Sequence, residues 1–552
     1  MAPAKYTIEP PYYPIVYVRG YAMRPSEREE TFHDTYYGFA ATSVEKRKAP
    51  PDEGYTGADV FEGQLIRFMK MRDYGYADQV NRGLEVFHAN PSRSIWICRF
   101  YDQDYISERL RSIEEHAEDL RKLVCETIPN RLRATGVDLG DQDRAYKVIL
   151  IAHSMGGLVC RTLIQNLLPN WTGASAPEKD PKRWIHRLVT IGTPHGGIEL
   201  GKIPDFLENF ITSQLNPFDA NIFTEERMRA YLKLTAKKGK QYRYDVHSLG
   251  PQNTPTAFPV KRCLCIIGSD YHSYGVVKEA TGNFSDGLVK QDRAYVVSGE
   301  APATNGVYRD EQKCFWANVH RAHSGYRGIV NSYESYENIQ RFLFGNIMAE
   351  MALDNLKINV VPESGSKYFY DFEFLFAIRK SSAYLHRREQ DPCENAMRYN
   401  LEDVPTRLPL HAGFLNSMLK DEGEQFSQFS FKFRVVEHRV REGMLWDHEY
   451  PDRPIYNETL EMRVADIDPR QPGVEVQYRW LSDGDDWTQV NPVNAEYRFR
   501  LRKAGSISDA TEVVIKVGPW PDPTLTRDED FVINAIQETR GKQNAQLSQG
   551  GN

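Results

Sequence analysis

One strand–turn–helix segment constrains the fold more than any other part of the sequence. The apolar run 148–151 is typical of a short buried strand, and 158–164 has the composition of a helix. Between them lies Ala152-His153-Ser154-Met155-Gly156-Gly157. A strand that turns sharply into a helix, with serine at the apex, is the context of a nucleophile elbow. The crowded turn needs small residues two positions before and after the serine, here Ala152 and Gly156. The alternative is a Gly-rich turn that merely starts a helix.

Length and composition limit the class of protein. With 552 residues the chain is too long for one ordinary domain, so we expect two or more. Apolar residues make up 41% and charged residues 26%, as in soluble globular proteins, and a net charge of −7 does not predict nucleic-acid binding. The sequence contains no run of about 18 apolar residues, so we expect no membrane span. The N-terminus lacks the apolar core of a signal peptide, so we expect a cytoplasmic protein or one exported by a signal-independent route.

Cysteine usage argues against a disulfide framework. The number of cysteines, seven, is odd, and several lie in expected core strands, so we expect reduced, buried thiols. Cys263 and Cys265 alternate along one apolar strand, but no second Cys/His pair follows at zinc-ligand spacing. We therefore expect no metal site and no cofactor.

Residues 1–350 alternate between expected strands and helices. Buried strands are predicted at 13–21, where the strand ends in a Gly turn, and at 94–100, 148–151, 185–192, 262–268 and 312–318. One long amphipathic helix is predicted from about Tyr105 to Thr127, and another from Ser332 to Phe344. This alternation predicts an α/β domain with a mostly parallel sheet covered by helices on both faces. Chemistry in such sheets lies at the carboxyl ends of the strands.

Two long insertions interrupt this pattern. Residues 22–93 are too many for a simple connection, and 198–250 predict short helices without a strand. Together they predict a helical cap. Aromatic residues in the second insertion could cover an acyl chain as a lid, or they could be ordinary packing of cap helices.

The character of the chain changes near Leu356. Short strands with alternating polar and apolar residues follow, separated by turns rich in Gly, Pro and Asp. The pattern predicts a smaller all-β, sandwich-like domain over 356–536. The tail 537–552 is rich in Gln, Gly and Asn and is predicted to be disordered.

Four local matches in the correct order resemble α/β-hydrolases, and within that superfamily bacterial lipases and esterases. They are Pro14 to Gly20, with Arg19 where His is usual, then the elbow around Ser154, Thr193-Pro194-His195-Gly196-Gly197, and Ser285-Asp286-Gly287-Leu288-Val289. The resemblance covers roughly residues 13–345. It implies the α/β-hydrolase fold and a triad in the order Ser, Asp, His.

Ser154 is the expected nucleophile, since a serine hydroxyl becomes reactive when a base and an orienting acid lie beside it. His323 is the preferred base because its loop precedes a helix, as in the lipases, and His320 is the alternative. Asp286 is the preferred acid because of the Asp-Gly-Leu-Val segment. Its alternative is Asp270, directly after the strand that ends at Gly268.

Backbone N–H groups of Tyr21 and Met155 are the expected oxyanion hole. Arg19 either points into the pocket, where it could bind an acidic head group, or is structural. His153 and His195 lie in motifs whose histidines are usually supportive.

These features predict a serine hydrolase acting on carboxylic esters through an acyl-enzyme on Ser154. The sequence does not distinguish between a lipase, a phospholipase and an esterase for small esters. An acyltransferase with the same triad, a lipase-like effector acting on phospholipids and, least favoured, a non-catalytic binding protein are the alternatives. The expected partners are a lipid or small ester substrate, a lipid surface contacted peripherally, and a protein bound through the β-rich domain.

Overall fold

The computed structural model describes residues 5–20, 90–107, 111–140, 146–198, 221–272, 284–302, 308–324, 328–421, 423–441, 452–465, 475–502 and 505–521, with a few isolated positions between them. It divides into two compact units. The first contains the described residues up to Trp316 and Arg321–Ile339, and the second contains Ala317–His320 and the described part of Gln340–Pro523.

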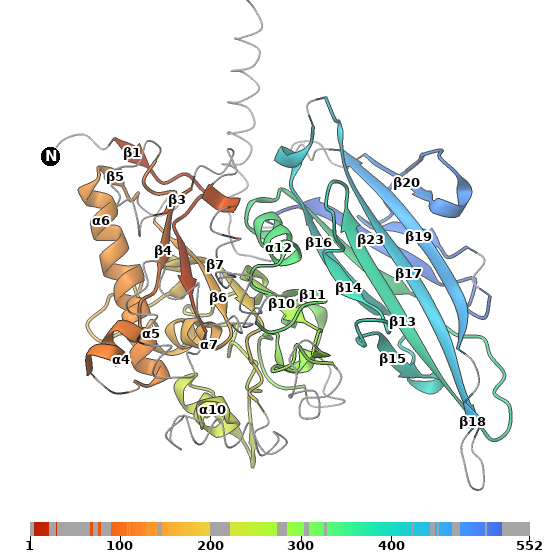
Figure 1. Ribbon diagram of the computed structural model, residues 1–552, viewed down its shortest axis with the longest axis horizontal. Coiled ribbons are helices and arrows are strands. Elements are labelled where there is room, and N and C mark those ends of the chain that lie inside the picture. Colours follow the sequence, from red (N-terminus) through yellow and green to blue (C-terminus); the bar gives the residue numbers. More distant parts are fainter. Residues whose placement is uncertain are drawn as a thin grey trace, which may run out of the picture. The chain divides into compact units, whose positions relative to one another are not determined.

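A seven-stranded sheet contains six strands of the first unit and a seventh, β11, whose last residues are assigned to the second unit (Figure 1). Its order is β11-β10-β7-β6-β2-β4-β3. The pairs from β10 to β3 are parallel throughout. The strands are β2 (Ile15–Val18), β3 (Ala77–Asp78), β4 (Ser94–Ile97), β6 (Val148–His153), β7 (Ile185–Ile191), β10 (Cys263–Gly268) and β11 (Phe315–Val319).

The central strands are buried along their whole length because helices cover the sheet. Every residue of β2, β6, β7 and β10 is buried, as expected where both faces of a parallel sheet are covered. Helix α7 (Met155–Thr162) packs against β2, β6 and β7, and α5 (Ile113–Lys122) packs against α7. Helix α7 continues as a π-helical turn, Leu163–Leu167. The predicted parallel sheet with covering helices is therefore present.

The prediction of one continuous helix from Tyr105 to Thr127 is wrong. The structure has α4 (Tyr101–Ser107), then α5 (Ile113–Lys122), a π-helical turn at Leu123–Thr127 and α6 (Ile128–Ala134). The break arises because Ser112 caps α5. Its side chain accepts from the Glu115 N–H, and the Glu115 carboxylate accepts from the Ser112 N–H. A capping box of this kind starts a new helix within a continuous apolar pattern.

The cap region differs in one respect from the prediction. Within 198–250 the structure has α10 (Glu225–Tyr231) and also a small hairpin of β8 (Lys237–Lys238) and β9 (Gln241–Tyr242). Gly239 adopts a φ of +67° in its turn, which explains why two short strands arise in a polar segment without periodicity. Residues 199–220 and most of 22–93 lie outside the described residues.

Two antiparallel sheets form the second unit. A four-stranded sheet has the order β16-β12-β23-β22, and a larger sheet has the order β14-β13-β17-β19-β20-β21, with β15 paired to β13 and β18 to β17. The strands are β12 (Ile347–Asp354), β13 (Ser366–Ile378), β14 (His386–Arg388), β15 (Met397–Asn400), β16 (Leu408–Leu415), β17 (Phe426–Arg441), β18 (His448–Glu449), β19 (Arg453–Ala465), β20 (Val476–Trp480), β21 (Thr488–Val490), β22 (Tyr497–Arg500) and β23 (Glu512–Pro519).

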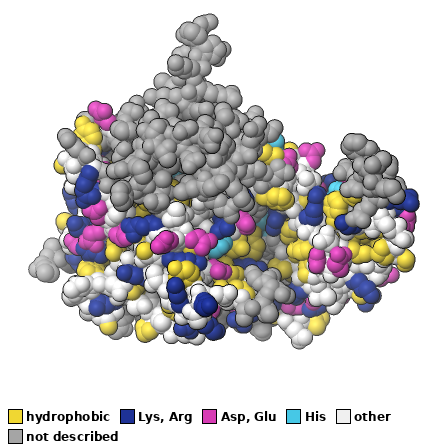
Figure 2. Space-filling model, turned by 90° about the horizontal axis from the view of Figure 1, so that it is seen from below, with side chains coloured by type: hydrophobic (Ala, Val, Ile, Leu, Met, Phe, Trp, Pro, Cys, Tyr) yellow, Lys and Arg dark blue, Asp and Glu magenta, His cyan; other side chains and the backbone are white. Residues whose placement is uncertain are grey.

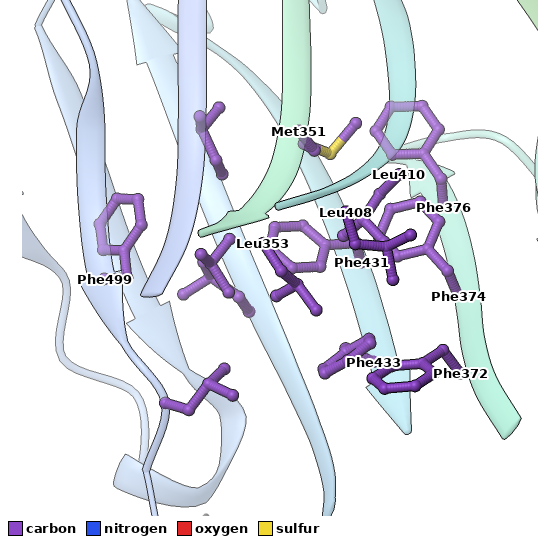
Figure 3. Packing of buried hydrophobic residues seen from close by; sticks show 14 of the residues in the cluster. Met351, Leu353, Phe372, Phe374, Phe376, Leu408, Leu410, Phe431, Phe433 and Phe499 are labelled. Atoms are coloured by element: carbon purple, nitrogen blue, oxygen red, sulfur yellow. The ribbon is translucent and has the colours of Figure 1, made fainter. Parts of the chain in front are cut away.

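The two sheets share one apolar core, which makes this unit a β-sandwich. Alternate residues of β13 and β17 point inward and are buried, as their period of two requires. They meet residues from β12, β16 and β22 of the other sheet in the same cluster. Figure 3 shows the packing of Phe372, Phe374, Phe376, Phe431 and Phe433 from one sheet with Met351, Leu353, Leu408, Leu410 and Phe499 from the other.

The β-rich unit starts earlier than Leu356. Strand β12 pairs along its whole length with β23, so Ile347 to Asp354 belong to the sandwich, although all of them precede the predicted start of the second domain. Its residues, Ile-Met-Ala-Glu-Met-Ala-Leu-Asp, include several good helix formers and continue directly from α12 (Tyr333–Phe344). The helix propensity of these residues therefore gave no indication of a strand. The tail 537–552 lies outside the described residues.

The charged side chains on the surface and the state of the cysteines agree with the composition. On the face drawn in Figure 2, Lys and Arg side chains are mixed with Asp and Glu. All seven cysteines are buried and free, as the sequence indicated. Among the described helices, none is both long and apolar enough to cross a bilayer.

A charged cluster joins three strands of the sandwich. His438 Nε2 lies 2.8 Å from Asp371 Oδ2, and His438 Nδ1 lies 2.6 Å from Asp452 Oδ1. Arg398 donates two hydrogen bonds of 2.7 Å to the Asp371 carboxylate. Burial alone would lower the pKa of His438, but the two carboxylates outweigh it and raise the pKa. The His438 imidazolium is therefore stabilised in the folded unit.

We expect His438 to make stability depend on pH. Because its folded pKa is raised, its contribution is complete below the unfolded value of about 6.5 and is lost as pH rises through the folded pKa. His438→Gln should therefore lower the thermal midpoint most at pH 5.5 to 6 and least near pH 9. Calorimetry across this range measures the difference, and a difference that stays constant would contradict the linkage.

Candidate active site

Ser154 lies in a strained turn between β6 and α7. Its backbone has a φ of 51° and a ψ of −128°. A positive φ is unfavourable for a residue with a side chain and persists where the surrounding structure enforces it. Such strained residues are concentrated at functional sites. The predicted strand–turn–helix context is therefore present around Ser154.

The end of β7 holds this turn in place. The Ser154 N–H donates to the Ile191 carbonyl at 2.9 Å, and the Thr193 hydroxyl donates to the Ser154 carbonyl at 2.9 Å. The Gly157 N–H donates to the same carbonyl at 3.0 Å. Both backbone polar groups of Ser154 are thus satisfied, although the residue is buried. The sequence singled out the loop at Thr193 by resemblance but gave Thr193 itself no role.

The small residues around Ser154 have a steric reason. A Cβ on Gly156 would lie 2.4 Å from the Val18 carbonyl oxygen and 2.5 Å from the Arg19 carbonyl oxygen. A Cβ on Gly20 would lie 2.9 Å from Ser154 Cβ. The end of β2 therefore presses against the first turn of α7, and glycine is required on both sides of the contact.

A chain of hydrogen bonds joins Ser154, His323 and Asp286. His323 Nε2 lies 3.0 Å from Ser154 Oγ, and His323 Nδ1 lies 2.8 Å from Asp286 Oδ2. Since a carboxylate only accepts, Nδ1 is assigned the proton, and Nε2 is left free to accept from the serine hydroxyl. This is the geometry of a nucleophile, a base and an orienting acid.

Asp286, the expected acid, is fixed by its own turn. Asp286 Oδ1 accepts from the N–H groups of Leu288 at 3.0 Å and Val289 at 2.7 Å. The Asp286 carbonyl accepts from the His323 N–H at 2.8 Å. Asp286 is 1% exposed and His323 4%, so the pair works in a largely water-free environment. A carboxylate that accepts several hydrogen bonds is held in one orientation.

Gly192, at the end of β7, lies directly beside Asp286 and His323. A Cβ at this position would lie 3.1 Å from both Asp286 Oδ2 and His323 Nδ1, and its φ of +56° also favours glycine. The sequence reasoning gave Gly192 no role. A glycine that ends a buried strand next to the elbow strand was the available signal.

The alternatives for base and acid occupy other positions. His323, not His320, contacts Ser154, and its carboxylate partner is Asp286 and not Asp270. His320 is half-buried after β11. Asp270 follows β10, and its N–H donates to the Arg321 carbonyl at 3.1 Å.

Only one of the two expected oxyanion donors lies within the described residues. Met155 is the first residue of α7, and the first N–H groups of a helix have no acceptor within it. Its N–H is therefore available next to the serine. Tyr21 lies outside the described residues.

Three further basic residues of the motifs are buried. The Arg19 guanidinium lies over the Tyr101 ring, 5.6 Å from its centroid. His195 Nε2 lies 2.9 Å from the Thr190 hydroxyl, and burial lowers the pKa of His195. His153 Nε2 lies 3.1 Å from the His323 carbonyl oxygen. Across the residues that the structure covers, no group of three or more His, Cys, Asp or Glu side chains could hold a metal ion.

A buried arginine that the sequence reasoning missed ties α7 to neighbouring loops. Arg161 is fully buried and donates to the carbonyls of His195 at 3.1 Å, Val246 at 2.9 Å and Ser248 at 2.8 Å. Burial lowers the pKa of Arg161 to about 10, so it stays charged at neutral pH. An arginine within an otherwise apolar helix face was the signal for such a role.

Comparisons with known proteins give distant structural similarity. No protein-family model matches the chain, and no curated protein matches it. Phospholipase PlaB from Legionella pneumophila is 12% identical with a TM-score of 0.29, covering 80% of this chain and 91% of that chain. Its complex with thio-NAD is 10% identical with a TM-score of 0.30, covering 79% and 91%. A chain of the Tle4–Tli4 complex is 14% identical with a TM-score of 0.19, covering 59% and 66%. Similarity at this level does not show a common fold or activity.

Gly156→Ala should disturb the elbow. The added methyl would meet two backbone carbonyl oxygens that cannot rotate away, and such overpacking costs about 1–3 kcal/mol. We expect a lower thermal midpoint by calorimetry. Gly518→Ala is the control, since nothing lies within 4 Å of its added Cβ. Equal midpoints for the two variants would show that the contact between β2 and α7 is not tight.

Proposed function

We propose that the first unit is a serine hydrolase that cleaves carboxylic esters through an acyl-enzyme on Ser154. The observation that carries this proposal is the hydrogen-bonded chain from Ser154 Oγ through His323 to Asp286. Its distances, 3.0 and 2.8 Å, are within hydrogen-bond reach without substrate. The strained backbone of Ser154 adds an independent argument.

In the proposed mechanism His323 acts first as base and then as acid. As Ser154 Oγ attacks the ester carbonyl, Nε2 of His323 takes the hydroxyl proton and then gives it to the leaving alcohol. Asp286 holds the Nδ1 proton and stabilises the imidazolium while it exists. A water molecule, activated by His323 in the same way, then hydrolyses the acyl-enzyme. No group other than these side chains and water is needed for the proton transfers.

The tetrahedral intermediate needs donors for its oxyanion. We assign the Met155 N–H as one donor, because it follows the nucleophile at the start of α7. Preorganised donors of this kind contribute about 3–4 kcal/mol each in a water-excluded site. The Tyr21 N–H remains the proposed second donor.

We further propose that the first unit has the α/β-hydrolase fold. Support comes from the parallel sheet and from the positions of the three residues on it. Ser154 lies between β6 and α7, Asp286 follows β10 and His323 follows β11. Ser, Asp and His in this chain order are the order of that fold. The substrate class, an ester with an apolar acyl part, rests on the sequence resemblance to lipases and esterases.

Ser154→Ala should abolish ester hydrolysis. The variant has no other attacking group, so we expect kcat on p-nitrophenyl esters to fall by about 10³-fold or more. A fluorophosphonate probe should label the unmodified protein and not the variant. Ser175→Ala, at an exposed serine, is the control and should keep both properties. More than a few per cent of residual turnover in Ser154→Ala would refute the proposal.

His323→Ala and Asp286→Ala should each reduce kcat strongly, and the double variant should lose little beyond the worse single one. Three residues that act as a unit give non-additive losses. His320→Ala and Asp270→Asn are the matched controls and should stay active. Turnover on esters of increasing acyl length, with a phospholipid alongside, measures the effects and defines the substrate. Loss of activity in His320→Ala with an active His323→Ala would overturn the assignment of the base.

A further inference from the structure

His153 links the nucleophile to the base. It is the last residue of β6, directly before Ser154, and it is 3% exposed. Its ring Nε2 lies 3.1 Å from the backbone carbonyl oxygen of His323. The centroids of the two imidazole rings are 4.9 Å apart with an interplanar angle of 39°. A single dipeptide, His153-Ser154, therefore contacts His323 both at its ring and at its backbone.

The acceptor of this hydrogen bond fixes the tautomer of His153. A carbonyl oxygen has no proton to give, so Nε2 of His153 must carry one. A neutral imidazole then has no proton on Nδ1. That atom is buried, and within the described part of the chain it has no hydrogen-bond partner. It faces Gly20, whose added Cβ would lie 3.2 Å away. A second proton on Nδ1 would have no acceptor there among the described residues.

The surroundings keep His153 neutral. Burial, and next the neighbouring ionisable ring of His323, lower the pKa of His153 well below its usual value. When His323 becomes an imidazolium during the reaction, a second positive charge on His153 is opposed even more strongly. His153 therefore acts as a neutral hydrogen-bond donor and not as a proton carrier.

The backbone of His323 is held from both sides. Its N–H donates to the Asp286 carbonyl at 2.8 Å, and its carbonyl accepts from His153. His323 lies in the connection between β11 and α12, and it follows Ala322, whose carbonyl accepts from the Ile329 N–H at 2.8 Å. A base on a connection needs such support, because displacing reacting groups by about 1 Å can cost about 10²-fold in rate.

We propose that His153 is a positioning residue that sets the distance between His323 Nε2 and Ser154 Oγ by donating a hydrogen bond to the His323 backbone carbonyl. This inference rests on the proposed function of the triad. It adds a role for the residue before the nucleophile. Because His153 and Ser154 are adjacent in the chain, the hydrogen bond from His153 fixes the position of His323 relative to Ser154.

A matched pair of variants separates the hydrogen bond from the volume of the ring. In glutamine the amide nitrogen lies as many bonds from Cα as Nε2 does in histidine, so His153→Gln retains a donor. Methionine has the same length and shape without a donor. We expect His153→Met to lower kcat on a short p-nitrophenyl ester by about 10- to 100-fold with little change in KM. His153→Gln should recover most of that loss.

The pH profile distinguishes positioning from a charge effect. If His153 acts as a neutral donor, the acid limb of kcat/KM keeps its midpoint in both variants. A shift of that limb to higher pH in both would mean that a positive charge on His153 acts on His323, and it would overturn the proposal. Thermal midpoints measured alongside should be similar for the two variants, which excludes a difference in folding as the cause.

Failure of this inference and failure of the proposed function give different results. Wild-type kcat in His153→Met, or equal losses in the Gln and Met variants, would remove the positioning role and leave Ser154 as the nucleophile. Retained turnover and probe labelling in Ser154→Ala would instead remove the proposed function, whatever the His153 variants do.

Discussion

The strained turn at Ser154 is the constraint on which the rest of the site depends. A residue in such a conformation costs about 1–3 kcal/mol, so the fold must enforce it. Two strands do so: β7 supplies the Ile191 carbonyl, and the end of β2 packs its carbonyls against Gly156. The loop after β7 adds the Thr193 hydroxyl. These contacts together hold the backbone of Ser154 in a conformation that an ordinary helix start does not have.

Residues near these strand ends also contact Asp286, His323 and helix α7. Gly192 leaves room for the Asp286–His323 pair next to the strand end. In the last turn of α7, Arg161 donates to three backbone carbonyls, and the Ser248 carbonyl also accepts from Gln165. A buried cation satisfied by carbonyl dipoles is costly to replace, since a substitution removes a hydrogen-bond partner from each of those acceptors. Helix α7 is thus held at its start by the close packing of Gly156 and at its end by the hydrogen bonds of the Arg161 guanidinium.

The sequence predicted elements whose pattern is local and missed those whose cause is tertiary. The strand before Ser154, the parallel sheet and the antiparallel β-rich unit follow from runs and alternation of apolar residues. Strand β12 was missed because its helix formers become a strand by pairing with β23, far along the chain. The break before α5 was predictable in principle, since Ser112 and Glu115 have the spacing of a capping box, but the continuous apolar pattern outweighed it.

The assignment of acid and base shows why one motif was more informative than another. In Ser285-Asp286-Gly287-Leu288-Val289, Gly287 adopts a φ of +96°, which turns the next two N–H groups toward Asp286 Oδ1. That turn leaves Oδ2 for His323, so the local sequence alone encodes the orientation of the acid. For the base, the loop before a helix favoured His323 over His320, three residues earlier, but this local signal says nothing of the orientation of either ring. Groups distant in the sequence contact the backbone of His323: its N–H donates to the Asp286 carbonyl, and its carbonyl oxygen lies 3.1 Å from His153 Nε2. A sequence motif identifies a functional residue reliably when the residue's geometry is set within the motif itself.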